Sequence, residues 1–349
     1  MKILLVGSYR YEIYAPAFAY GFRQLGHEVV EIDYEQYHIK GDGFLITLLN
    51  KFQDRYHYGT QLRRYNRDII DAVEHEKPEI VFLYRCYHVY NTTLKAIRGK
   101  AIVMSYNNDD PFSGVPSNYY YRSHLSNSFF CDLNFVYRKK NIDDYSKIGV
   151  CNTKILLPYY LSWQNIPVTC KKSIPLAFIG HYENDGRDYC IKRLIDEGFP
   201  VQLYGGDLWK QSKYFADLES YYHGEAFGDE YNRLINKTKV LLVFFSKHNH
   251  DTYTRRCFEI PASKGVMLSE YTKDMDELFP AGDCAIYFNN PEELIERYKK
   301  LIARPEELER ISENSYRRLH EIGGSELDRV KEIIECYNEI SKNESHRMD

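Results

Sequence analysis

The chain has 349 residues, of which 44% are hydrophobic and 28% are charged. This length is more than one ordinary doubly wound domain needs and is typical of two, and the composition is that of a folded globular protein. The net charge of -4 argues against nucleic acid as a partner, because non-specific nucleic-acid binding is driven by positive charge.

The spacing of the cysteines and the length of the apolar runs indicate the cellular compartment of the protein. Eight cysteines are scattered without close pairs, so neither a disulfide framework nor a zinc ribbon is predicted. The apolar run at residues 3–6 is too short for a signal-peptide core, and no run elsewhere is long enough to span a bilayer. We therefore expect a cytoplasmic protein. Tyrosine is abundant, at 33 residues, which suits sugar recognition, although biased codon usage explains it equally well.

The first half of the chain predicts a βαβ unit. A strand at 3–6 is followed by a helix from about 16 to 25, which Gly26 ends, and by a second strand at 28–32. Strands joined by a helix predict a parallel sheet. Further strands are predicted at 80–83, 101–105 and 134–137, so residues 1–160 are expected to form one α/β domain.

The second half restarts the same pattern. A strand at 175–180, a helix at 187–197 and strands at 201–204, 240–245 and 266–269 predict a second α/β domain over residues 171–323. The linker is expected within 157–172, which contains Pro158 and Pro167 without a clear period. Asn290 and Pro291 predict a helix start. Residues 324–349 predict a last helix that packs back towards the N-terminal domain.

The most informative segment is residues 250–265, just before the strand at 266–269. Asp251 and Glu259 stand eight residues apart, with Arg255 and Arg256 between them. A carboxylate can accept both hydrogens of a ribose diol, and an arginine can neutralise a diphosphate, most of all as charge develops on a leaving group. This combination predicts a nucleotide-sugar site.

Because Arg255 and Arg256 are consecutive, only one of them is expected to face that site. We assign Arg255 to the diphosphate, with Arg256 solvated or in contact with another domain. Thr254 precedes or opens the helix that carries Glu259, so free N–H groups at the start of that helix are expected to point at the same phosphates.

The chain resembles the CgeB-like (spore maturation protein) glycosyltransferases, which have the GT-B fold. The resemblance rests on the Arg-x-Phe-Glu-Ile-Pro-Ala core at residues 256–262, on residues 178–180 with Arg187, and on the Asn-Asn-Asp-Asp-Pro-Phe run at 107–112. It implies two Rossmann-like doubly wound domains that face a cleft, with the acceptor bound by residues 1–160 and the nucleotide-sugar donor by 171–323.

The resemblance also implies roles in the donor domain. Glu259 holds the ribose and Asp251 approaches the donor sugar, although the family has a longer glutamate at the latter position; this spacing favours retention of configuration. Gly180 belongs to the donor site, and Arg187 stands where many relatives have a phosphate-binding lysine. His181, which replaces an arginine of the family, either contacts the donor or caps its loop. The base is expected beside Tyr222 and Gly224.

In the first domain, Asp109 and Asp110 follow the strand at 101–105, at the edge of the sheet where α/β proteins bind ligands. Either aspartate could act as a general base, or the pair forms an Asx-turn before Pro111. The acceptor is expected to lie near Gly7, Ser8, Tyr84 and Tyr106, with further residues of the stretch 84–88.

We therefore expect a hexosyl or related transferase that moves a sugar from a nucleotide sugar, with UDP as the expected nucleotide, to a glycan, protein or metabolite. No metal or other cofactor is expected. A nucleotide-sugar epimerase and a non-catalytic nucleotide-sugar-binding protein are the alternatives. Basic residues such as Arg55, Arg63, Arg64 and Arg67 either meet an anionic or lipid-linked acceptor or form a solvated helix face. A peripheral membrane contact is left open as well.

Overall fold

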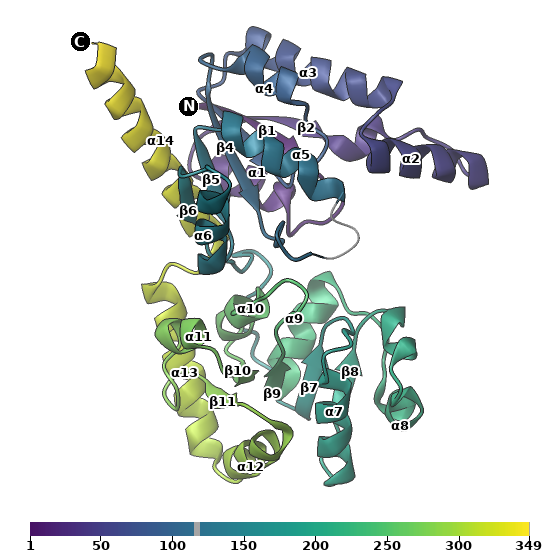
Figure 1. The fold of residues 1–349 in the computed structure, drawn as a ribbon. Helices are drawn as coiled ribbons and strands as arrows, with labels where there is room; N and C mark the ends of the chain where they lie inside the picture. The colour runs from purple at the N-terminus through teal and green to yellow at the C-terminus, as the bar shows by residue number, and fades with distance from the viewer. Residues whose placement is uncertain (115–118, 349) are drawn as a thin grey trace. The chain divides into compact units, whose positions relative to one another are not determined.

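The computed structural model describes residues 1–114 and 119–348, which form two compact units (Figure 1). Unit 1 comprises Met1–Leu157 together with Glu326–Asp349, and unit 2 comprises Pro158–Ser325. The C-terminal helix therefore belongs to the same unit as the N-terminal strand. Each unit has its own parallel sheet and its own hydrophobic core.

Unit 1 is built on a six-stranded sheet with the order β2-β1-β3-β4-β5-β6, in which every pair is parallel. The strands are β1 (Lys2–Gly7), β2 (Glu28–Asp33), β3 (Ile80–Tyr84), β4 (Ile102–Asn107), β5 (Leu133–Val136) and β6 (Thr153–Ile155). The central strands β3 and β4 are buried along their whole length, as expected for a parallel sheet covered on both faces.

Seven helices surround this sheet within the described residues: α1 (Ala15–Gln24), α2 (Phe44–Tyr56), α3 (Thr60–Glu76), α4 (Asn91–Ile97), α5 (Tyr119–Asn127), α6 (Lys139–Lys147) and α14 (Glu326–Met348). Helix α14 packs against α1, and a Cβ atom at Gly21 of α1 would meet Val330 of α14 at 2.8 Å. A glycine at this point permits the close approach of the two helices.

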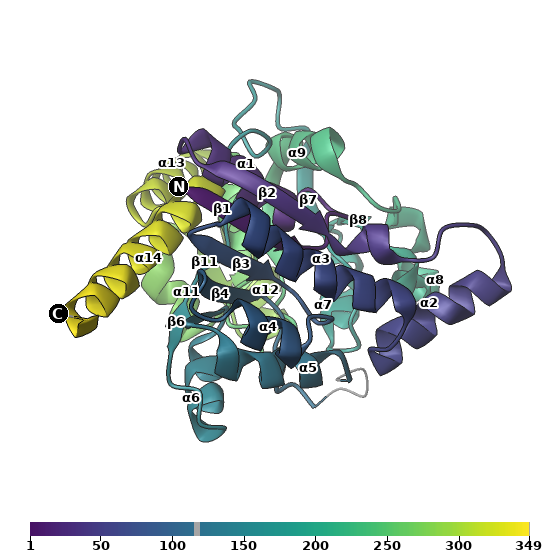
Figure 2. The same ribbon diagram turned by 90° about the horizontal axis from the view of Figure 1, so that it is seen from above.

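Unit 2 has a five-stranded parallel sheet with the order β11-β10-β9-β7-β8. The strands are β7 (Ile174–Ile179), β8 (Gln202–Tyr204), β9 (Thr238–Val243), β10 (Val266–Glu270) and β11 (Ile286–Phe288). The helices are α7 (Arg187–Asp196), α8 (Phe215–Leu218), α9 (Gly228–Lys237), α10 (Arg256–Ala262), α11 (Lys273–Leu278), α12 (Pro291–Ile302) and α13 (Pro305–Glu321). Figure 2 shows the same elements from above.

The winding of each sheet creates one point where ligands can enter. In unit 1 the chain passes from β1 outward to β2 and then returns to β3 on the other side of β1; in unit 2 it passes from β7 to β8 and returns to β9. The loops that follow β1 and β3 therefore run to opposite sides, and so do the loops that follow β7 and β9. Each divergence leaves a crevice at the carboxyl ends of the two strands. The sites are expected between β1 and β3 and between β7 and β9.

The predicted fold class is confirmed, because both units are doubly wound α/β structures. Most predicted elements are present with ends shifted by one or two residues. The side chain of Asn290 caps α12 by accepting from the backbone N–H of Glu293 at 2.9 Å, as its position before Pro291 predicts. The helices α2 to α6, α8, α9, α11 and α13 and the short strands β6 and β11 were not predicted.

The described part of the chain holds no helix that is long and apolar enough to cross a membrane.

The end of β8 is packed so closely that a methyl group cannot enter. A Cβ at Gly205 would lie 2.3 Å from the carbonyl oxygen of Gly180 and 2.6 Å from the indole nitrogen of Trp209, which donates to the same oxygen. A Cβ at Gly206 would meet only the flexible end of Glu225. We predict that Gly205→Ala lowers the free energy of unfolding by about 2–3 kcal/mol, whereas Gly206→Ala changes it by less than about 1 kcal/mol. Urea denaturation of both variants measures this, and equal losses would contradict it.

Candidate functional site

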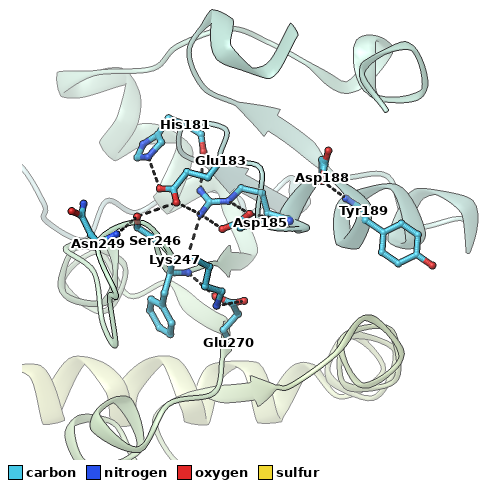
Figure 3. A network of polar contacts seen from close by, with 11 residues as sticks. His181, Glu183, Asp185, Asp188, Tyr189, Ser246, Lys247, Asn249 and Glu270 are labelled. Atoms are coloured by element: carbon cyan, nitrogen blue, oxygen red, sulfur yellow. Dashed lines mark hydrogen bonds and ion pairs between the residues drawn. The ribbon is translucent and has the colours of Figure 1, made fainter. Parts of the chain in front are cut away.

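The loop between β7 and α7 is fastened to the end of β9 by a buried ion network (Figure 3). Arg187 donates to Asp185 from Nε at 2.9 Å and from Nη2 at 2.6 Å, and to the carbonyl oxygen of His181 at 2.9 Å. Its Nη2 also donates to the carbonyl oxygen of Phe245, just beyond β9, at 3.4 Å. Figure 3 shows these groups gathered where the two strands end.

This network gives Arg187 a different role from the expected one. The side chain is buried, with 2% of the residue exposed, and its guanidinium donates to groups of the loop itself. These contacts order the loop. His181 is exposed, and its Nε2 lies 2.9 Å from Oε1 of Glu183, so it does cap the loop.

Glu183 joins the same network from the other side. It also accepts from Ser246 Oγ at 3.0 Å, and Nη2 of Arg187 lies 3.6 Å away. Burial opposes ionisation of this carboxyl, but the hydrogen bond with His181 and the charge of Arg187 outweigh it and lower the pKa of Glu183 to about 2. A carboxylate in this position holds the loops after β7 and β9 together.

Glu259 lies on α10 between two donors. Arg255 Nε lies 2.6 Å from its Oε1, and the hydroxyl of Tyr231, on α9, donates to its Oε2 at 2.5 Å. Burial and then the Glu259 charge raise the pKa of Tyr231 well above its usual value, so the phenol stays protonated as a donor. The carboxylate is therefore held in one orientation, and each oxygen keeps a further lone pair for a ligand.

Arg255 forms an ion pair with Glu259, and its guanidinium also lies over the ring of Tyr159, at 5.4 Å from the ring centroid. Arg256 points elsewhere. A Cβ built on Gly180 would lie 3.1 Å from Nη1 of Arg256, so the guanidinium lies directly beside the end of β7. Its Nε is buried and has no hydrogen-bond partner among the described residues.

The two arginines thus have the reverse of the expected arrangement. We expected Arg255 to face the diphosphate and Arg256 to be solvated or to contact another domain. The structure pairs Arg255 with Glu259 and places Arg256 at the crevice of the sheet. The helix that follows is also short, since α10 spans seven residues and contains Pro261, so its dipole is smaller than expected.

The loop after β9 carries the remaining residues of the predicted motif. The backbone N–H of Asp251 donates to the carbonyl oxygen of Ser246 at 2.9 Å, which places Asp251 in the loop that Glu183 also contacts. Thr252 Oγ1 donates to Asp274 at 2.6 Å and ties this loop to α11. Thr254 precedes α10, and its carbonyl oxygen accepts from the N–H of Cys257.

The predicted base-binding stretch runs beside the end of β8. The backbone N–H of His223 donates to the carbonyl oxygen of Leu203, and Gly205 donates to that of Gly224 at 2.7 Å. The hydroxyl of Tyr222 donates to the carbonyl oxygen of Gly205 at 2.9 Å. Tyr222 and Gly224 are therefore anchored at the same sheet edge as Gly180, next to β7.

Unit 1 has a pocket of about 330 Å³ at its own crevice, between the ends of β1 and β3. Three of the expected acceptor residues, Gly7, Ser8 and Tyr84, line it. Tyr106 does not, because it is buried in the core and its hydroxyl donates to the carbonyl oxygen of Leu156 at 3.3 Å. Six tyrosines line the pocket: Tyr11, Tyr14, Tyr34, Tyr65, Tyr84 and Tyr87.

The two candidate general bases of unit 1, Asp109 and Asp110, have different surroundings. Asp110 is fully buried, accepts from the backbone N–H of Phe112 at 2.9 Å and from Asn141 at 2.8 Å, and so forms the Asx-turn. Asp109 accepts from Arg85 Nη2 at 2.6 Å and from the hydroxyl of Tyr87 at 3.1 Å, and both of these residues line the pocket. Asp109 thus positions the pocket wall.

Several polar residues of this pocket were not predicted, among them Glu35, His38 and Asp54. Glu35 accepts from Ser8 Oγ at 2.6 Å, and His38 Nε2 lies 3.1 Å from Asp54 Oδ1. Glu35 and His38 follow the strand that ends at Asp33, so their position after a strand was a usable signal. Asp54 lies in the last turn of a helix, and no local pattern indicates its role.

Among residues 1–114 and 119–348, no group of three or more His, Cys, Asp or Glu side chains is arranged to hold a metal ion.

The carboxylate of Glu183 makes stability depend on pH in a defined direction. A pKa lowered to about 2 in the folded protein means that the ionised group stabilises the fold above its ordinary pKa of 4.5, and that this contribution is lost as the pH falls towards 2. We predict that Glu183→Gln lowers stability at pH 7 and makes the decline in stability below pH 5 shallower. Urea denaturation at several pH values measures the free energy of unfolding of the wild type and of Glu183→Gln. If the two free energies changed with pH in parallel, the assignment would be contradicted.

Comparison with known proteins finds one family model and solved structures of similar fold. Residues 187–322 match the family model described as glycosyl transferase-like. A search of curated proteins by sequence found no match.

Solved structures match nearly the whole chain. Anabaena HepE in complex with UDP has a TM-score of 0.66 at 10% identity, covering 97% of this chain and 100% of that one. Sucrose-phosphate synthase from Thermosynechococcus elongatus has 0.68 at 10% identity, covering 98% and 100%. A putative UDP-N-acetylglucosamine 2-epimerase from Listeria monocytogenes has 0.56 at 12% identity, covering 92% and 94%. The chain has the two-sheet α/β fold of GT-B glycosyltransferase structures, and residues 187–322 of unit 2 are glycosyl transferase-like.

Proposed function

We propose that the protein is a glycosyltransferase that takes a sugar from a nucleotide sugar, with UDP as the nucleotide, and that unit 2 binds this donor. One observation carries the proposal. The glycosyl transferase-like segment, residues 187–322, includes the Arg256, Glu259 and Tyr222 positions, and these side chains lie around the end of β7 and its neighbours. The relatives of the same fold include one solved with UDP.

Arg256 binds the diphosphate in this proposal. Its guanidinium lies beside Gly180, where the absence of a side chain lets a phosphate approach the backbone. Negative charge on the leaving diphosphate grows as the bond to the sugar breaks, so a fixed cation stabilises the transition state more than the ground state. This role requires no metal ion, and we propose a metal-independent reaction.

Glu259 binds the ribose. Arg255 and Tyr231 hold its two oxygens in place, so the carboxylate need not reorganise when a diol arrives. The base lies along the stretch around Tyr222 and Gly224. Asp251 approaches the donor sugar, and its spacing from Glu259 favours retention of configuration.

The acceptor binds in the pocket of unit 1. Tyrosines supply ring faces that cover the C–H patches of a sugar and hydroxyls that bond to its OH groups, and six of them line this pocket. Arg85, held by Asp109, and the carboxylates of Glu35 and Asp54 add charged partners for hydroxyls. We therefore propose a hydroxyl-bearing acceptor: a glycan, a glycosylated protein or a sugar-like metabolite.

An epimerase is the second candidate, because a putative UDP-N-acetylglucosamine 2-epimerase shares the fold. The two functions differ in whether an acceptor is needed. An epimerase needs acid–base groups around the donor sugar, whereas a transferase needs a separate acceptor site, and the polar pocket of unit 1 favours the transferase.

The proposal predicts selective binding of one nucleotide. In a thermal-shift titration with UDP, GDP, CDP and dTDP and their sugar conjugates, we expect UDP and a UDP-sugar to raise the melting temperature, with or without EDTA. The UDP-sugar should then release UDP faster when glycan acceptors are added. Conversion of the sugar without any acceptor would indicate the epimerase, and binding without turnover would indicate a binding protein.

The arginine assignment predicts two different defects. Arg256→Ala should lower kcat by roughly 100-fold while the melting temperature changes little, because a cation facing the diphosphate is lost. Arg255→Ala should weaken UDP binding and destabilise the fold by about 2 kcal/mol, because Glu259 loses its ion-pair partner. Arg256→Lys is the matched control and should restore part of kcat. If Arg255→Ala alone impaired kcat without loss of stability, the assignment would be reversed.

A further inference from the structure

Helix α2 turns its apolar face to the solvent. Phe44, Leu45, Leu48, Leu49, Phe52 and Tyr56 are exposed, with exposed fractions from 49% for Phe52 to 79% for Phe44. At 100° per residue these six positions, with the spacing i, i+1, i+4, i+5, i+8, i+12, fall within one side of the helix. Single exposed apolar residues are ordinary, but a continuous stripe of this size indicates an interaction surface.

The opposite side of α2 holds the helix to unit 1 through polar groups. Asn50 exchanges two hydrogen bonds with the backbone of Ile39, at 2.8 and 3.0 Å. Gln53, which is buried, donates to the carbonyl oxygen of Tyr37 at 3.2 Å. Asp54 accepts from the hydroxyl of Tyr34 at 2.5 Å. The usual pattern of a surface helix is thus inverted, with polar residues inward and apolar residues outward.

The flanking backbone presents α2 as a separate element. Gly41 and Gly43 before it have φ of +126° and +129°, and Gly59 after it has φ of +156°, a conformation that favours glycine. Both ribbon views show α2 extending beyond the sheet of unit 1 (Figures 1 and 2). The apolar stripe is therefore presented along the full length of the helix.

Basic side chains border the stripe. Lys51 and Arg55 lie on α2 at one margin of the apolar face, and Arg63 at the start of α3 lies over the ring of Tyr58, which is also exposed. The acidic residue of the helix, Asp54, is turned inward to Tyr34 and His38. The exposed side of α2 thus combines apolar and aromatic residues with positive charge, the composition of helices that lie in the interface of an anionic membrane.

We propose that α2 docks this protein on the surface of an anionic lipid membrane, with its apolar stripe among the acyl chains and Lys51, Arg55 and Arg63 at the lipid phosphates. In an antiparallel pair of α2 helices related by a two-fold axis, the two positively charged margins would lie on the same side, whereas a negative lipid surface complements them. The inference does not depend on the proposed enzyme activity.

Vesicle co-sedimentation of the full chain tests the proposal. We expect the protein to sediment with vesicles of two parts phosphatidylcholine and one part phosphatidylglycerol, much less with phosphatidylcholine alone, and less at high salt. Leu48→Ser with Phe52→Ser should lower the affinity by roughly 10-fold or more, since both side chains leave the acyl region. Lys51→Glu with Arg55→Glu should remove the preference for phosphatidylglycerol.

The matched control replaces an equally exposed Leu–Phe pair of unit 2, Leu208→Ser with Phe227→Ser, and should bind vesicles like the wild type. Circular dichroism melts verify that each variant is folded. Absence of vesicle binding by the wild type, or equal binding by the α2 variant and the control, would overturn the proposal. Light scattering tests for a dimer. If the wild type and the control were dimers and Leu48→Ser with Phe52→Ser were a monomer, a second copy would be the occupant and the membrane proposal would be overturned as well.

Discussion

The ion pair between Arg255 and Glu259 fixes the arrangement of the side chains at the start of α10. Two strong donors, Arg255 at 2.6 Å and Tyr231 at 2.5 Å, hold the carboxylate of Glu259 in one orientation. Arg255 is paired with Glu259, whereas the next residue, Arg256, lies beside Gly180 at the end of β7. Consecutive residues of a helix point about 100° apart, so the two arginines reach different surroundings.

Both units place their polar groups at the crevice that the winding of the sheet creates, but they build it differently. Unit 2 closes its loop with the buried network of Arg187, Asp185 and Glu183, which leaves little freedom at the ends of β7 and β9. Unit 1 uses a strained residue: Arg85 has φ of +52°, and its guanidinium lies between Tyr14 and Asp109. A strained backbone held by several partners at a ligand-binding edge is typical of a functional position.

The sequence predicted the fold well because it depends on signals that are local. Apolar runs, Gly26 and Pro291 indicate strands and helix ends directly. The sites depended on contacts across the chain. That Glu259 carries an ion pair follows from its spacing to Arg255, but Tyr231 is 28 residues away and no pattern joins them. Asp110 and Arg187 have the residue types of a functional site, and only their burial among Asn141 and Asp185, respectively, shows that they support loops. Helix α2 was not predicted, although its apolar residues have helical spacing, and the sequence does not show that this apolar face points outward.

The attachment of α2 also links it to the pocket of unit 1. Asp54 lies on the inward side of the helix and lines the pocket, where it contacts Tyr34 and His38, two further residues of the wall. The hydrogen bond with Asp54 raises the pKa of His38 and outweighs burial, which lowers it, and this favours a charged pair between helix and pocket. His88, stacked on Tyr34 with 4.3 Å between centroids, stays neutral instead, because burial lowers its pKa to about 3. A movement of α2 would therefore displace Asp54 and with it the charged part of the pocket wall, so the surface that holds α2 in place also determines the shape in which the pocket meets its ligand.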